Sequence, residues 1–142
     1  MNYVRLLVVG ISSGILFSFM DVLINQNAMA KTMFEYYKTI ARHDLHPYLI
    51  ILIFVIYGLI MAFIYAILSK SLPGKSGFSK GASFALIAWF FRVVMYSVTQ
   101  WTILPVPPAT LAYLVISGLG QMLVLGWFYG MFLKQEERKS LL

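Results

Sequence analysis

The sequence predicts an all-α, polytopic membrane protein with four transmembrane helices in an antiparallel bundle, forming one domain over residues 1–142. Of these residues, 61% are hydrophobic and 11% are charged, whereas a typical soluble domain is about 25% charged. Four apolar runs are each about as long as the roughly 20-residue helix that crosses the hydrocarbon core of a bilayer. Most Lys and Arg residues lie between these runs or near the chain ends.

Each apolar run is predicted to be a helix, because a bilayer offers no water to the backbone and a helix satisfies its own polar groups. Transmembrane strands would be about half as long and would alternate in polarity. The first run has a basic residue, Arg5, at its start, as a secretory signal would, but its apolar stretch is too long for one, so we interpret it as a retained helix. The predicted spans cover residues 4–24, 48–68, 81–103 and 109–133.

The longest connection, residues 26–47, is predicted to contain an amphipathic helix on the outer side. Met29, Met33 and Tyr37 recur at roughly helical spacing, and a Lys31–Glu35 pair at i,i+4 would support the helix. Such a segment can lie at the level of the lipid headgroups. It would either cover the mouth of the bundle or act as a partner-binding or gating element.

The distribution of basic residues predicts the orientation of the chain. Cytoplasmic loops carry the excess of Lys and Arg in membrane proteins. We therefore expect a multi-pass protein of the cell membrane with both termini and the 70–80 connection in the cytoplasm. Three basic residues fall on the opposite side, and seven fall on the predicted cytoplasmic side: Arg5, Lys70, Lys75, Lys80, Lys134, Arg138 and Lys139.

Two ionisable residues interrupt the apolar runs, Asp21 near the outer end of the first and Arg92 near the middle of the third. A charge at the centre of a transmembrane helix costs about 2.5–3.5 kcal/mol on insertion scales. Tyr96 and Gln100 follow Arg92 at four-residue intervals, so these side chains are predicted to share one helix face. We expect one intramembrane polar site, open to the outer side, formed by Asp21, Asn25, Arg92, Tyr96, Gln100 and Gln121.

Three roles are open for this polar site. An internal Asp21–Arg92 ion pair with amide hydrogen bonds would fix helix packing, at about 0.6–2 kcal/mol for each interhelical contact. The second role is a binding site for an anionic or polar ligand, and the third is a proton or ion path. A cavity that reaches Arg92 from the outer side would favour a ligand. A direct Asp21–Arg92 contact in a dry interior would favour the packing role.

Two G-x-x-x-G patterns, Gly10–Gly14 and Gly126–Gly130, predict close helix contacts. Small residues at this spacing allow two helix backbones to approach each other. The contacts would lie inside the bundle or, alternatively, at the surface of a homo-oligomer or a partner.

The sequence offers no recognisable catalytic or cofactor site. It contains no Cys, which excludes thiolate metal sites and Cys nucleophiles. His43 and His46 lack the H-E-x-x-H pattern of zinc hydrolases, and no predicted span contains the His that haem ligation would favour. We therefore expect no metal, no cofactor and no enzymatic activity, and no nucleic-acid partner, because a basic face on a soluble domain is missing.

Several segments carry a family resemblance, namely Asp21–Asn27, Ser71–Gly74, and Lys80–Gly81 running into Ala88–Arg92. Over its whole length the chain resembles an uncharacterised family of small four-helix integral membrane proteins from prokaryotes. The resemblance implies a four-helix membrane topology and says nothing about a mechanism.

The function expected from the sequence is that of a small, non-catalytic integral membrane protein, as a subunit of a larger membrane complex. The alternative is a transporter or channel for a small polar or anionic solute that uses Asp21 and Arg92. The expected partners are the lipid bilayer and other membrane proteins or a second copy of the chain.

Overall fold

The computed structural model describes residues 3–39 and 46–133, and every regular element within these ranges is a helix. Four helical stretches are long and apolar enough to cross a membrane. They are Tyr3–Asn25 (α1), Pro47–Leu68 (α3), Gly77–Ile103 (α4, η2 and α5) and Pro108–Phe132 (α6). The predicted all-α fold class, with four helices of transmembrane length, is confirmed.

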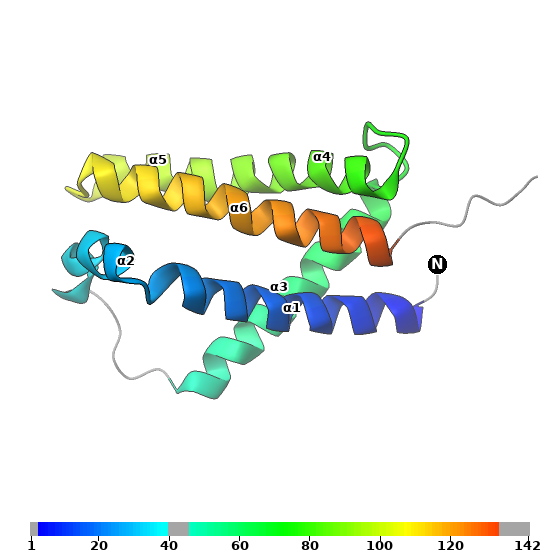
Figure 1. Ribbon diagram of the computed structural model, residues 1–142, viewed down its shortest axis with the longest axis horizontal. Coiled ribbons are helices and arrows are strands. Elements are labelled where there is room, and N and C mark those ends of the chain that lie inside the picture. Colours follow the sequence, from blue (N-terminus) through cyan, green and yellow to red (C-terminus); the bar gives the residue numbers. More distant parts are fainter. Residues whose placement is uncertain (1–2, 40–45, 134–142) are drawn as a thin grey trace, which may run out of the picture.

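The four stretches alternate in direction along the bundle, as Figure 1 shows. α4 and α5 run beside α6, whereas α3 crosses α1 obliquely (Figure 1). The start of α1, the α3–α4 connection and the end of α6 lie at one end of the molecule. The short helix α2 (Ala28–Met33) and the α5–α6 turn lie at the other.

The bundle consists of two helix pairs, α1 with α3 and α4 with α6, which meet mainly along α1 and α6. Glycines allow both close contacts. A Cβ atom on Gly58 of α3 would lie 2.5 Å from the carbonyl oxygen of Gly10 and from the amide nitrogen of Gly14. Between α4 and α6, Gly81 and Gly126 lie so close that neither position has room for a Cβ atom.

The helix boundaries follow from caps and prolines. Ser76 caps α4 by accepting a hydrogen bond from the backbone N–H of Ser79 at 3.1 Å, a common way to satisfy an unpaired amide at a helix start. Pro47 and Pro108 begin α3 and α6, where a missing N–H costs nothing. Gly74 has a φ of +130°, which an L-residue with a side chain rarely adopts, and this allows the tight turn before α4.

The third stretch is not a continuous α-helix. Residues Phe90–Val94 (η2) form a π-helical turn between α4 (Gly77–Trp89) and α5 (Met95–Ile103). The backbone N–H of Met95 donates to the carbonyl of Phe90, five residues earlier. Turns of this kind are rare and frequently occur at functional sites. Arg92 lies in the middle of this turn.

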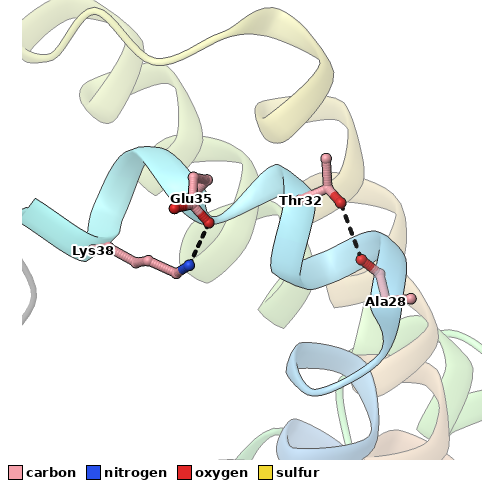
Figure 2. Close-up of polar contacts among 4 residues, drawn as sticks. All are labelled: Ala28, Thr32, Glu35 and Lys38. Carbon is pink, nitrogen blue, oxygen red and sulfur yellow. Dashed lines mark hydrogen bonds and ion pairs between the residues drawn. The ribbon is translucent and has the colours of Figure 1, made fainter.

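The connection between α1 and α3 also differs from the single amphipathic helix expected for it. The chain forms α2 and then a separate 3-10 helix η1 (Glu35–Thr39), with a break at Phe34. Figure 2 shows the contacts that hold the two turns: the Thr32 hydroxyl donates to the Ala28 carbonyl, and Glu35 pairs with Lys38. The i,i+3 pair replaces the expected Lys31–Glu35 pair because the tighter helix brings residues three apart onto one face.

Candidate functional site

A cavity of about 320 Å³ lies between α1, the η2–α5 segment and α6. One turn of helix separates Asp21 from Asn25 on α1, so both side chains face it. Gly118 on α6 allows Val93 to approach, because a Cβ there would lie 2.7 Å from Cγ1 of Val93. The polar side chains that line the cavity are Asp21, Asn25, Arg92, Tyr96, Ser97, Ser117 and Gln121.

The guanidinium group of Arg92 packs against two aromatic rings. Its central carbon lies 4.3 Å from the ring centroid of Phe17 on α1 and 4.4 Å from that of Tyr57 on α3. The two rings are themselves stacked, with centroids 5.4 Å apart. Aromatic faces attract a guanidinium electrostatically, most strongly where water is excluded. Arg92 therefore links the α4–α6 pair to the α1–α3 pair.

Asp21 and Arg92 line the same cavity without forming a direct ion pair, although each lies in the electrostatic field of the other. Asp21 lies instead beside the side chains of Asn25 and Gln121. The internal ion pair considered for the packing role is thus not formed between these two described residues. Both charges border a cavity.

Two buried polar groups at this cavity have no hydrogen-bonding partner among the described residues. They are the side-chain hydroxyl of Ser97, which is 5% exposed, and the amide nitrogen of Gln121, which is 7% exposed. An unsatisfied buried donor costs about 1–3 kcal/mol, and such groups are rare in native proteins. Together with Arg92 they bring unpaired donors from three elements, η2, α5 and α6, to one space.

A second cavity of about 340 Å³, which we call the vestibule, adjoins the first at the α2 end. Phe34 and Tyr37 line the vestibule but not the first cavity, whereas Asn25, Tyr96 and Leu114 line both. The hydroxyl of Tyr37 is also buried without a partner among the described residues. Burial raises the pKa of Tyr37, and Tyr96 raises it further, so this hydroxyl stays protonated and can donate.

Hydrogen bonds fix the segment that walls the vestibule. The Asn27 side chain caps α2 by accepting from the Ala30 amide at 2.8 Å, and it donates to the Tyr113 hydroxyl at 2.9 Å. The Tyr113 hydroxyl donates in turn to the carbonyl of Ile24 at 2.6 Å. Thr110 donates to the Met33 carbonyl at 2.9 Å. α2 is therefore tied to both α1 and α6.

The structure brings together most of the residues predicted for the polar site. Asp21, Asn25, Arg92, Tyr96 and Gln121 all line the first cavity. Gln100 does not line it; its side-chain amide donates to the Tyr96 hydroxyl instead. Among the predicted packing residues, Gly10 and Gly14 contact α3, and Gly126 and Gly130 contact α4.

Sequence reasoning missed three contributors to the site, Phe17, Tyr57 and Ser97. The two aromatic residues lie in apolar runs, where nothing in the sequence separates a ring beside a cation from a ring beside lipid. Ser97 is five residues after Arg92, and a π-turn places residues at i and i+5 on one face. The pattern Gly77–Gly81, which packs against Gly126 and Gly130, was visible as a third G-x-x-x-G motif.

No group of three His, Asp or Glu side chains that could hold a metal ion occurs within residues 3–39 and 46–133. His46 precedes α3, and its ring stacks on Tyr48 with centroids 5.4 Å apart. His43 lies outside the described residues.

Comparison with known proteins gives one match. Residues 7–140 match the model of a family described as "Family of unknown function (DUF6789)". No curated protein and no solved structure matches the chain.

Proposed function

The chain belongs to this family of unknown function, and from its geometry we propose a multi-pass membrane protein that binds and carries a small polar or anionic solute. Membrane insertion is supported by the apolar side chains on the outer surface of all four long helices, such as Ile15, Ile53, Phe91 and Ile116. In water, exposed apolar area costs about 25 cal/mol per Å² relative to its burial. In hydrocarbon the same surface carries no such cost.

The cavity at Arg92 is the observation that carries the solute-binding proposal. A half-buried arginine and two unpartnered donors, Ser97 and Gln121, border a space large enough for a small molecule. A role in packing alone would require neither a cavity nor unpartnered buried donors, which are rare in native proteins. A polar or anionic solute, or the water it displaces, would satisfy these groups.

The proposed orientation places the vestibule on the outer side of the cell membrane. Lys70, Lys75 and Lys80 lie near the α3–α4 connection, at the end opposite α2. Because basic residues favour the cytoplasmic side, the chain ends would be cytoplasmic and the vestibule would open outward. The proposal assigns no catalytic step to the chain.

A cysteine-accessibility experiment tests both the membrane and the cavity, since the natural sequence has no Cys. Ser117→Cys places a thiol at the cavity. Ile116→Cys is the matched control, because Ile116 is 71% exposed on the outer surface of the same helix. Both variants would be treated, in native membranes, with a membrane-impermeant methanethiosulfonate added from the outer side.

We expect labelling of Ser117→Cys and protection of Ile116→Cys, because a thiol in hydrocarbon does not ionise and the thiolate is the reactive species. Labelling of both, with Ile116→Cys the faster, would show that water surrounds the helices. Labelling of neither, together with stoichiometric co-purification of another membrane protein, would favour a subunit whose cavity the partner closes.

A further inference from the structure

Two opposite charges lie at different depths of the same cavity. On α1, Phe17 and Asp21 are separated by one turn, which is about 6 Å along the axis. The Arg92 guanidinium lies against Phe17, whereas Asp21 lies one turn nearer to α2. The cavity is therefore positive at its deep end and negative towards the vestibule.

The deep end has the donors that recognise a carboxylate. A guanidinium presents a planar fork of N–H groups that matches a carboxylate in two parallel hydrogen bonds. The rings of Phe17 and Tyr57 pack against the Arg92 guanidinium and favour a fixed position for it. Ser97, which lies further along α5 towards the vestibule, and Gln121, whose side chain lies beside Asp21, add two donors without partners at the same cavity.

The shallow end has the groups that recognise an ammonium. Asp21 supplies a carboxylate, and Asn25 lies one turn further along α1. Beyond them the vestibule is lined by the aromatic side chains of Phe34, Tyr37 and Tyr96. Aromatic faces attract ammonium groups, with a gain of about 0.5–2 kcal/mol each.

We propose that the solute is a zwitterion of the amino-acid class, with its carboxylate at Arg92 and its ammonium at Asp21. This inference rests on the proposed function and names its substrate class. A simple anion would occupy Arg92 and leave the Asp21 carboxylate, which lies beside the neutral side chains of Asn25 and Gln121, without a cationic partner inside the protein, which is costly. A zwitterion satisfies both charges and leaves the net charge of the cavity unchanged.

The test uses the wild-type protein in detergent and measures its melting temperature with added solutes, because a ligand that binds only the folded state raises it. The probes are glycine, β-alanine and γ-aminobutyrate, which differ in the distance between their charges. The controls are propionate alone, propylammonium alone and an equimolar mixture of the two. We expect at least one zwitterion to raise the melting temperature, with the controls producing no shift at equal concentration.

Two variants connect the binding to the two charges. Arg92→Gln and Asp21→Asn each remove the protein charge that would pair with one charge of the ligand, so each is expected to weaken binding of the best zwitterion about 30-fold or more. Arg92→Lys keeps the charge and should recover part of the affinity. The comparison of probes on the wild-type protein does not depend on whether these variants fold.

An equal shift with propionate and β-alanine would overturn the zwitterion assignment and leave the anion-binding proposal standing. No shift with any zwitterion would also overturn it. Failure of the proposed function itself is read separately, from the absence of Ser117→Cys labelling in membranes.

Discussion

The hydroxyl of Tyr129 on α6 donates a hydrogen bond to the hydroxyl of Ser13 on α1 at 3.0 Å. Both side chains are fully buried, and the bond lies where α1, α3 and α6 meet. Ser13 donates to the Gly10 carbonyl at 2.8 Å, and the Gly58 carbonyl of α3 lies 3.3 Å from the Tyr129 oxygen. This small hydrogen-bond network joins the α1–α3 pair to the α4–α6 pair.

Tyr129→Phe should destabilise the protein by about 0.6–2 kcal/mol, because it removes an interhelical hydrogen bond and leaves Ser13 with fewer partners. The measurement is unfolding in mixed micelles as sodium dodecyl sulfate is added. Tyr3→Phe is the control, since Tyr3 is 70% exposed, and it should leave the transition in place. Equal midpoints for Tyr129→Phe and the wild type would show that the bond does not contribute to stability.

Gly58→Ala should be strongly destabilising, by about 1–3 kcal/mol or more, because the new methyl group would meet backbone atoms of Gly10 and Gly14 that cannot move aside independently. Gly120→Ala provides the contrast. A Cβ at Gly120 meets nothing within 4 Å, and alanine is the better helix former by about 1 kcal/mol. The same micelle titration should move the two midpoints in opposite directions. A wild-type midpoint for Gly58→Ala would contradict the packing described for α1 and α3.

Asn27→Ala should loosen the wall of the vestibule while leaving the long helices intact. The substitution removes the cap of α2 and the hydrogen bond to Tyr113, a loss of about 1 kcal/mol for the cap alone. Amide hydrogen exchange of residues 28–33 should accelerate by about fivefold or more. Gln26→Ala, at an exposed neighbouring position, should exchange as the wild type does. Unchanged exchange in Asn27→Ala would mean that packing alone holds α2.

Arg92→Ala should lower the melting temperature in detergent, because it removes the contacts of the guanidinium with Phe17 and Tyr57. Two cation–π contacts of about 0.5–2 kcal/mol each set the scale. Lys75→Ala, in the exposed α3–α4 connection, should melt as the wild type does. A wild-type midpoint for Arg92→Ala would exclude a structural role for these contacts. The arginine would then have only a functional role.

The sequence was sufficient for the four long helices because length and uniform apolarity decide them. It did not reveal the break at Phe34, because periodic apolar residues mark a helical face without marking where that face ends. The π-turn at Phe90–Val94 was equally hidden, since no single residue type causes it. The polar site was largely predictable for the opposite reason: an arginine in an apolar run needs partners, and few polar residues are available.

The contacts of Arg92 could not be predicted in the same way. Electrostatics alone favoured Asp21 as its partner, whereas the folded chain places the guanidinium on Phe17 and Tyr57. The ring of Tyr57 comes from α3, which approaches α1 closely through the contacts of Gly58 with Gly10 and Gly14. The Arg92 guanidinium is thus held by two uncharged rings.

The division of the bundle into two tightly joined pairs has a mechanical consequence. Backbone contacts at glycines join α1 to α3 and α4 to α6 into two units, which meet mainly along α1 and α6. Asp21 belongs to one unit and Arg92 to the other, so a shift of one unit against the other changes the separation of the two charges. A molecule bound to both Asp21 and Arg92 would fix the distance between them and hold the two helix pairs in one relative position.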